Sequence, residues 1–383
     1  MSETEYSCIE KTVEPDVSVY LHNKAAALGI PATCTFELTS RCNFNCKMCY
    51  IHNCECAVKE STELSTEQWL DIGRQAAEAG TVFLLLTGGE PMMRKDFCDI
   101  YRGFKKLGFY ITINTNASMI SDSVFEMFRE DPPGRLNISL YGASEDTYER
   151  LCGTRSFNTV IDNIRKAIGY GIQIRLNFSI TPFNCGDIAG VYKIAGDLGL
   201  NVKSTAYMYP PLQADNYSDK INWRFDPEKA AYYRVENEYI RSGRDKFLLS
   251  AEQLFNHIST YKPVIVNEGE KVRCRAGSST CWINCRGEMS FCGMVNGEDN
   301  NVLEKGYLNS WLTVRSRTRL IRLPLKCTSC KIRAICNICA SVCYSETGSY
   351  AEAPEYVCRM SEKTIEYIKQ KAVEIGDVDY EKI

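Results

Sequence analysis

The 383-residue chain has no apolar run of the length needed to cross a membrane, about 20 residues. Its apolar stretch at residues 82–86 is only long enough for a buried strand. Residues 1–5 include two glutamates and lack the apolar core of a secretory signal peptide. These absences exclude a membrane-spanning protein and predict a cytoplasmic one without a membrane partner.

The chain also lacks a large net charge of either sign. The chain has 45 Lys and Arg against 48 Asp and Glu, a net charge of −3, so the sequence predicts no nucleic-acid partner. It has no low-complexity segment, and no internal repeat beyond alternating strand and helix patterns. An apolar content of 44% and a charged content of 24% are typical of a folded globular protein. The length allows two or more domains.

What the chain does contain is cysteine, 20 residues of it. Without a secretory signal, so many cysteines indicate iron–sulfur or zinc ligation in a reducing compartment rather than a disulfide framework. The tightest group reads Cys42-x3-Cys46-x2-Cys49. Three thiolates on one loop can hold three irons of a [4Fe–4S] cluster and leave the fourth iron open for chemistry. A structural zinc site is the alternative, although such sites usually have four ligands in paired spacing.

From residue 33 onward, strand and helix patterns alternate. Six such repeats in about 175 residues predict a parallel sheet with helical crossovers. They are too few for a closed eightfold barrel, so we expect an α/β fold with an open, partial (β/α)6 TIM-type barrel and functional groups at the strands' carboxyl ends. Ser65 and Gln68 fit a capping box, and Gly153 breaks a long helical stretch. The predicted divisions are an N-terminal extension 1–32, the barrel 33–210, a bridging region 211–270 and a small α+β domain 271–383.

The cysteine motif, together with Gly88-Gly89-Glu90-Pro91 after the second strand, resembles the radical S-adenosylmethionine (SAM) enzymes. In that family SAM binds the open iron, and an electron splits it to methionine and a 5′-deoxyadenosyl radical that abstracts a hydrogen atom. The resemblance implies SAM contacts from Met48 and Tyr50 (adenine), Gly88, Gly89 and Glu90 (amino group), Asn114 and Asn116 (ribose), Ser139 with Arg150 or Arg155 (carboxylate), and Asn177. Simple turns, for the glycines and asparagines, and surface ion pairs, for the arginines, are the structural alternatives.

The remaining cysteines resemble the SPASM domain, a C-terminal iron–sulfur extension in a subset of radical SAM enzymes. Cys274-x12-Gly287-x4-Cys292 and Cys327-x2-Cys330-x5-Cys336 fit its spacing, whereas Cys336-x2-Cys339 is one residue short. The resemblance implies two auxiliary [4Fe–4S] clusters besides the SAM-binding one. The first would use Cys274, Cys281, Cys292 and Cys339, with Cys343 as an alternative to Cys339, and the second Cys327, Cys330, Cys336 and Cys358. Two zinc sites are the alternative.

Nine cysteines fall outside these three sets, among them Cys54, Cys56, Cys285 and Cys343. Cys285 and Cys343 are the candidates for a catalytic thiol, and buried free thiols are the alternative. SPASM proteins mostly modify ribosomally made peptides. We therefore expect a peptide substrate, an external flavodoxin- or ferredoxin-type electron donor, and oxidative crosslinking through a thioether or carbon–carbon bond. The alternatives are a peptide epimerase, a formylglycine maturase, an enzyme acting on a small molecule or tetrapyrrole, and a non-catalytic metal-binding scaffold.

Overall fold

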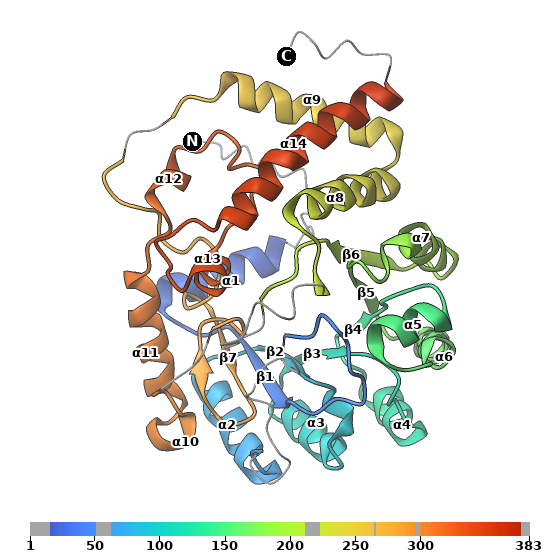
Figure 1. Ribbon diagram of the computed structural model, residues 1–383. Helices are drawn as coiled ribbons and strands as arrows, with labels where there is room; N and C mark the ends of the chain where they lie inside the picture. The colour runs from blue at the N-terminus through green and yellow to red at the C-terminus, as the bar shows by residue number, and fades with distance from the viewer. Residues whose placement is uncertain (1–15, 51–62, 211–222, 264–265, 296–298, 377–383) are drawn as a thin grey trace.

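The computed structural model describes residues 16–50, 63–210, 223–263, 266–295 and 299–376. Six parallel strands form the centre, with helices on their outer side (Figure 1). The strands are β1 (Thr33–Thr39), β2 (Phe83–Gly88), β3 (Tyr110–Thr115), β4 (Arg135–Ser139), β5 (Ile174–Ser179) and β6 (Asn201–Thr205). Intervening elements are α2 (Thr66–Glu78), η2 (Pro91–Met93), α3 (Phe97–Lys106), α4 (Asp122–Glu130), α5 (Glu145–Cys152), α6 (Phe157–Gly169), η3 (Cys185–Asp187) and α7 (Ile188–Asp197). The predicted open α/β barrel is thereby confirmed.

The C-terminal region adds two more strands to the same sheet. The strand β7 (Thr280–Ile283) pairs in parallel with β1, and the short β8 (Met289–Ser290) closes an antiparallel hairpin at the edge. The resulting order is β6-β5-β4-β3-β2-β1-β7-β8. Residues on both sides of the predicted boundary at residue 271 therefore share one sheet and one hydrophobic core.

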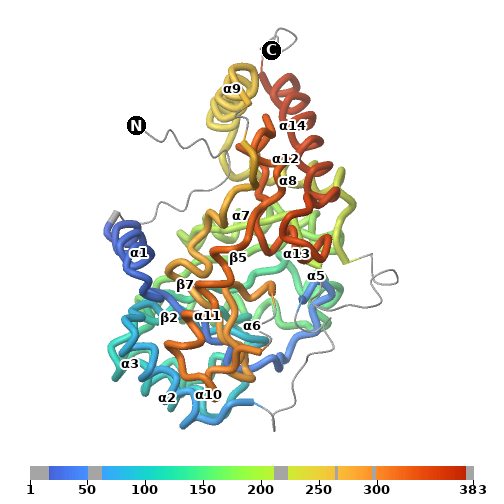
Figure 2. Tube along the Cα trace, turned by 90° about the vertical axis from the view of Figure 1, so that its left-hand side faces the viewer, coloured from blue at the N-terminus to red at the C-terminus, as the bar shows by residue number. Residues whose placement is uncertain are grey.

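Two further groups of helices pack outside the barrel strands. Helix α1 (Asp16–Leu28) lies beside α11 (Tyr307–Leu320), where the Trp311 indole donates to the Gly29 carbonyl at 2.6 Å. Figures 1 and 2 both place α8, α9 and α14 together at one end of the molecule. These helices are α8 (Pro227–Ser242), α9 (Arg244–Thr260) and α14 (Glu355–Ile375). Three short helices complete the C-terminal region: α10 (Val302–Lys305), α12 (Leu325–Thr328) and α13 (Ala340–Thr347).

Two helix-end signals predicted from the sequence are present in the structure. The Ser65 hydroxyl accepts from the Gln68 backbone, and the Gln68 side chain accepts from the Ser65 backbone, so the capping box starts α2. Gly153 ends α5 in the left-handed conformation with φ +71°, which divides the helical stretch into α5 and α6.

The two faces of the sheet differ in polarity, which decides where a site can form. Phe36 on β1 is fully buried on the outer face, in contact with Trp69 of α2 and Phe104 of α3. Side chains alternate along a strand, so its neighbour Glu37 faces inward. The inner face carries a row of polar side chains at paired strand positions: Glu37, Thr87, Asn114, Asn137 and Arg175. Closed TIM barrels usually fill this space with apolar side chains, so the polar interior here is suited to binding a ligand.

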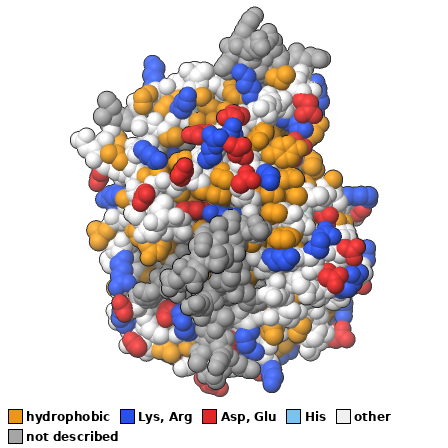
Figure 3. Space-filling model, viewed as in Figure 1, with side chains coloured by type: hydrophobic (Ala, Val, Ile, Leu, Met, Phe, Trp, Pro, Cys, Tyr) orange, Lys and Arg blue, Asp and Glu red, His pale blue; other side chains and the backbone are white. Residues whose placement is uncertain are grey.

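No helix in the described part of the chain is long and apolar enough to cross a membrane. On the face shown in Figure 3, basic and acidic side chains are interspersed rather than gathered by sign. This distribution agrees with the net charge of −3.

Candidate active site

The loop after β1 brings its three cysteines together at the carboxyl end of the barrel. Burial raises the pKa of the Cys42 thiol to about 12, and Glu90, Cys46 and Cys49 are close enough to raise it further. The Cys49 amide donates to the Cys46 carbonyl at 3.0 Å. Neutral thiols packed in this way become metal-binding thiolates only when a cation compensates them, which fits a site for a metal cluster.

Helix α5 supports this loop from outside. The amides of Asn45 and Lys47 donate to the Cys152 and Leu151 carbonyls at 2.9 and 3.0 Å. The Cys152 thiol also contacts the Cys46 thiol and raises its pKa well above the ordinary value, with burial as the second cause. Cys152 was not singled out in the sequence, because it reaches the motif only through the packing of α5.

Gly88 and Gly89 are needed because they pack against the cluster loop. The amide of Gly89 donates to the Thr39 carbonyl at 2.8 Å, and that of Glu90 to the Arg41 carbonyl at 2.8 Å. A Cβ on Gly88 would lie 2.1 Å from the Thr39 oxygen, and one on Gly89 2.2 Å from the Arg41 oxygen. The close approach is therefore between two backbone segments, and it joins the start of the cluster loop to the end of β2.

The Glu90 side chain holds neighbouring backbone in place. Its carboxylate accepts from the Thr115 hydroxyl at 2.9 Å and from the amides of Asn116 and Met92 at 2.7 and 3.2 Å. Burial raises its pKa to about 7, while these donors act in the opposite direction. With the carboxylate engaged in this way, the groups of this segment that suit the SAM ammonium are its backbone carbonyls.

Asn116 connects the end of β3 to the cluster loop. Its side-chain oxygen accepts from the Ser118 amide at 2.8 Å, which is the Asx turn named as the alternative. Its amide group donates to the Asn43 oxygen at 2.9 Å and approaches the Cys42 sulfur at 3.7 Å. The Phe44 amide also donates to this sulfur, at 3.4 Å. Asn116 is thus placed to orient the Cys42 sulfur as well as to form the turn.

Replacing Asn116 with alanine should weaken cluster retention and SAM cleavage by roughly 10- to 100-fold, as loss of such supporting contacts typically does. The measurements are iron content after anaerobic dialysis and 5′-deoxyadenosine formed per unit time. Asn309→Ala is the control, since it removes a similar 2.9 Å amide-to-carbonyl bond on α11. Equal iron retention in both variants would contradict the role assigned to Asn116.

The other predicted SAM contacts are spread along the inner face. The Asn114 oxygen accepts from Asn137 at 2.8 Å, and its amide donates to Thr87 at 3.4 Å. Ser139 and Asn177 are paired across β4 and β5. Met48 is buried in the cluster loop, next to Cys49. Hydrogen bonds within the polar row therefore connect β2, β3 and β4.

The two candidate arginines lie on the outside. Arg150 is exposed and donates to Thr147 on its own helix, at 3.0 Å. Arg155 forms exposed ion pairs with Asp146 and Glu149, which is the surface alternative named above. The arginines at inward-facing strand positions are Arg135 and Arg175, which the sequence reading missed. Arg135 is the first residue of β4 and donates to the Asn137 oxygen at 3.0 Å, and Arg175 is near the start of β5, in register with Asn137. An arginine that alternates with apolar residues in a predicted strand is the signal that could have found them.

Three C-terminal cysteines gather around Tyr209. The Cys339 sulfur lies 3.9 Å from the Tyr209 hydroxyl. Burial raises the pKa of Cys274, and the thiols of Cys339 and Cys292 raise it further. The structure thus brings together three of the four cysteines predicted for the first auxiliary cluster, with a phenol beside them.

Cys281, the fourth residue of that predicted set, points elsewhere. It lies on β7 opposite Cys34 of β1, and its sulfur is 3.1 Å from the Cys34 sulfur and 3.5 Å from the Tyr307 hydroxyl. All three side chains are buried on the outer face of the sheet. The strand pairing of β7 with β1 turns this thiol away from Cys274, Cys292 and Cys339, which together form the Cys274 group.

The second predicted set comes together as a group. Burial raises the pKa of Cys327 to about 11, with Cys336 and Cys358 as the next contributions, and Cys330 acts in the same direction. Cys343 is buried beside this group: burial raises its pKa to about 12, followed by the thiols of Cys327, Cys339 and Cys336. Across the described ranges no three Cys, His, Asp or Glu side chains converge as they would on a single metal ion.

Among the leftover cysteines, Cys285 is buried near the barrel interior. Burial raises its pKa to about 12, and Glu37 is the next contribution. Cys54 and Cys56 lie outside the described residues.

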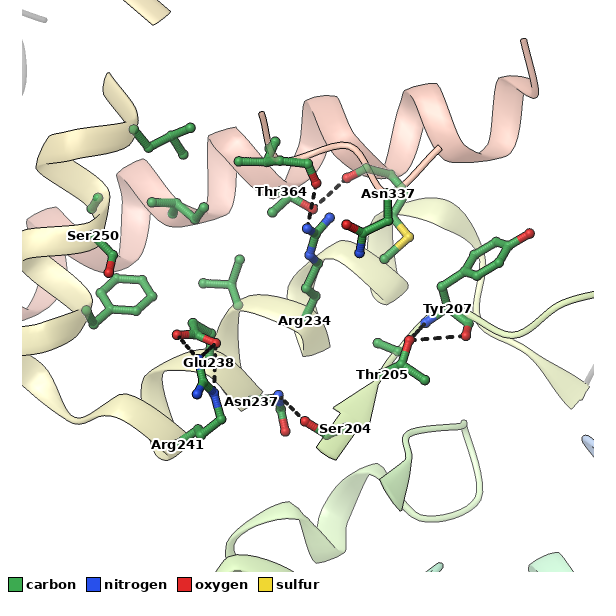
Figure 4. Close-up of a pocket in the computed structure, with 18 residues that line it drawn as sticks. Ser204, Thr205, Tyr207, Arg234, Asn237, Glu238, Arg241, Ser250, Asn337 and Thr364 are labelled. Atoms are coloured by element: carbon green, nitrogen blue, oxygen red, sulfur yellow. Dashed lines mark hydrogen bonds and ion pairs between the residues drawn. The ribbon is translucent and has the colours of Figure 1, made fainter. Parts of the chain in front are cut away.

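A separate pocket lies between β6, α8, α9 and α14 (Figure 4). It contains about 840 Å³ of empty space, counting its open mouth. Its polar side chains largely contact protein: Arg234 donates to the Ile335 carbonyl at 2.6 Å, and Arg241 pairs with Glu238 at 2.7 Å. The pocket is adjacent to Cys336 rather than to the cluster loop of β1.

Comparison with known proteins identifies the barrel. Residues 36–184 match the family model of the radical SAM superfamily. The chain therefore contains a radical SAM domain. It extends from β1 to the segment after β5, and includes the cluster loop and the Gly-Gly-Glu turn. The superfamily uses SAM and a [4Fe–4S] cluster, which implies catalytic activity for this domain.

Curated relatives share the radical SAM domain. The chain is 22% identical over 347 residues to an AdoMet-dependent heme synthase of Methanosarcina barkeri, covering 86% of this chain and 97% of the relative. It is 31% identical over 175 residues to a probable GTP 3′,8-cyclase of Saccharolobus solfataricus, covering 45% of this chain but only 56% of the cyclase.

Solved structures share the overall fold. SuiB of Streptococcus suis superposes with a TM-score of 0.63 at 20% identity, covering 89% of this chain and 81% of SuiB. The structure of anSMEcpe with bound AdoMet has a TM-score of 0.63 at 16% identity, covering 90% of this chain and 98% of that one. Both likenesses extend beyond the radical SAM domain into the C-terminal cysteine region.

Proposed function

We propose that this enzyme modifies a ribosomally made peptide by hydrogen-atom abstraction and oxidative crosslinking. The observation that supports this most strongly is the placement of Tyr50. Its phenol directly follows the cluster loop, and both the Cys49 thiol and the Cys292 thiol of the Cys274 group act on it. Tyr50 is therefore near both the Cys49 thiol of the cluster loop and the Cys292 thiol of the C-terminal region.

In this proposal Cys42, Cys46 and Cys49 hold the SAM-binding cluster. Cys274, Cys292 and Cys339 hold the first auxiliary cluster, with Tyr209 beside it, and Cys327, Cys330, Cys336 and Cys358 hold the second. A bound cluster supplies the electron that cleaves SAM, and an auxiliary one can accept the electron that an oxidative product must lose. The protein's own groups position the peptide: the polar row on the inner face offers donors and acceptors to its backbone.

The related structures agree with a peptide substrate. SuiB has been solved bound to the precursor peptide SuiA, and anSMEcpe bound to the Cp18Cys peptide. A flavodoxin- or ferredoxin-type electron donor remains our expectation.

The test is anaerobic co-expression of this chain with each short open reading frame beside its gene, followed by mass spectrometry of the peptides. We expect one peptide to lose two hydrogens, and the loss to disappear with Cys42→Ala. Deuterium gain in heavy water without mass loss would instead indicate an epimerase, and conversion of Ser or Cys to formylglycine would indicate a maturase of that kind. No change in any peptide would contradict the peptide proposal.

A tetrapyrrole substrate is the second candidate, supported by the near full-length similarity to the heme synthase. It predicts that a porphyrin panel incubated with enzyme, SAM and dithionite changes in mass while the neighbouring peptides do not. If neither peptides nor porphyrins change and no 5′-deoxyadenosine forms, the scaffold alternative applies.

A further inference from the structure

A carboxylate projects into the barrel interior without belonging to the SAM motif. Glu37 lies on β1 between Phe36 and Leu38, whose side chains are fully buried on the outer face. It is in register with Thr87 of β2, so it starts the polar row of the inner face. Its carboxylate accepts a hydrogen bond from the Trp282 indole at 3.1 Å. Trp282 belongs to β7, so the C-terminal region contributes to this position.

Glu37 lies close to groups from two distant parts of the chain. It is near the Tyr50 phenol, which directly follows the cluster loop, and near the Cys285 thiol of the C-terminal region. With the Trp282 indole of β7 as its donor, Glu37 therefore lies where the inner face of the barrel meets the C-terminal region.

The pKa of the Glu37 carboxyl lies close to neutral pH. Burial raises its pKa to about 7, opposed by the Trp282 indole and by the positive charge of Arg286. The titratable and charged groups acting around it are Tyr50, Cys285 and Arg286. A carboxylate with a pKa close to the working pH is the kind of group that accepts protons efficiently in catalysis.

A purely structural role explains only part of this arrangement. The Trp282 indole needs an acceptor, and a neutral glutamine would supply one without burying a charge. The carboxylate therefore adds a desolvation cost that the packing of β7 on β1 does not require. Groups of this kind in a ligand-binding interior are candidates for chemistry.

We propose that Glu37 is the general base of the reaction, which rests on the proposed oxidative function. Hydrogen-atom abstraction by the 5′-deoxyadenosyl radical leaves a carbon radical on the substrate. The second half of the reaction removes one proton and one electron from the substrate as the new bond forms. The proton goes to a Glu37 oxygen, and the electron goes to a one-electron acceptor of the iron–sulfur class. The substrate thereby loses two hydrogens in total.

The variant that tests this is Glu37→Gln, which keeps the volume and an oxygen to accept from Trp282. With the co-expressed peptide, the two-hydrogen loss should fall by at least about 100-fold, the usual contribution of a general base. Formation of 5′-deoxyadenosine should stay within about twofold of the wild type, because hydrogen abstraction precedes the proton transfer. In heavy water with excess dithionite, the substrate radical of the variant should take one electron from dithionite and one deuteron from the solvent, so the peptide should gain one deuterium. Glu228→Gln is the control, since Glu228 is an exposed carboxylate paired with Arg359 and has no part in the surroundings of Glu37.

The wild-type pH profile gives a second readout. Below pH about 7 the carboxyl holds its proton and cannot accept another, so product formation should rise as pH increases through about 7. This rise should be absent from the residual activity of Glu37→Gln. Normal crosslinking by Glu37→Gln would overturn the proposal and leave the peptide function standing.

A spectroscopic measurement separates this proposal from the function it rests on. The infrared difference spectrum between wild type and Glu37→Gln should show a protonated carboxyl band that titrates near pH 7. If the wild type modified no peptide, the peptide function would fail while this band still reported on Glu37. Absence of the band would overturn the assignment of Glu37 as a proton acceptor whatever the substrate.

Discussion

Replacing Cys42 with alanine should abolish SAM cleavage and remove about four irons per chain, the content of one [4Fe–4S] cluster. Three thiolates are the minimum that holds such a cluster with one iron open, so the two remaining thiols of the loop are not enough. The loss should reach background, because no radical can form without the cluster. The measurements are iron and sulfide content and 5′-deoxyadenosine formed with dithionite and SAM under anaerobic conditions.

Cys42 is a cleaner choice than Cys46 for this experiment. The Cys152 thiol contacts Cys46 and offers a substitute ligand if Cys46 is removed. Cys98→Ala is the matched control, because Cys98 is a partly buried cysteine on α3, outside all three groups. The control should keep its iron and its SAM cleavage. Undiminished 5′-deoxyadenosine from Cys42→Ala would show that the motif does not hold the reactive cluster.

Replacing Gly88 with alanine should destabilise the fold by about 3 kcal/mol or more and also stop SAM cleavage. The new Cβ would be 2.1 Å from the Thr39 carbonyl oxygen, which is backbone and cannot swing away. The φ of Gly88 is +142°, which L side chains rarely adopt. Overpacking usually costs about 1–3 kcal/mol, and here the backbone conformation adds to that cost. Chemical denaturation measures the stability, and 5′-deoxyadenosine formation measures the effect on the cluster loop.

Gly196→Ala on α7 provides the contrast. Nothing lies within 4 Å of its added Cβ, so the variant should be neutral or up to about 1 kcal/mol more stable, as for glycine to alanine in a helix. A Gly88→Ala protein as stable as this control would contradict the close packing of the turn on the cluster loop. Retained stability with lost SAM cleavage would show instead that the turn serves the ligand alone.

Much of the candidate site could be predicted from the sequence because it depends on residues that are close together along the chain. The cysteine spacing from Cys42 to Cys49, the Ser65 capping box and the break at Gly153 each involve residues within a few positions of one another. The strand and helix periodicity likewise predicted the open barrel, since burial of one face forces it locally. The resemblance singled out Gly88 as a SAM contact, and the structure adds a close approach of this glycine to the Thr39 backbone.

Other features arise from contacts between residues far apart in sequence. The pairing of β7 with β1 joins segments separated by 247 residues, and it turns Cys281 toward Cys34. The same pairing brings the Trp282 indole to Glu37. Spacing patterns cannot reveal such pairings, because they depend on which sheet edge is free once the barrel has formed.

The sequence by itself thus determined the barrel and the cysteine spacing that marks the radical SAM domain, because these rest on local spacing and on the period of apolar residues. Only the tertiary structure decided that Cys274, Cys292 and Cys339 meet at Tyr209, that Arg150 and Arg155 lie outside, and that Glu37 faces the barrel interior with the Trp282 indole as its donor. The physical reason is that side-chain direction follows strand pairing and helix packing, which are set by the whole chain rather than by its segments.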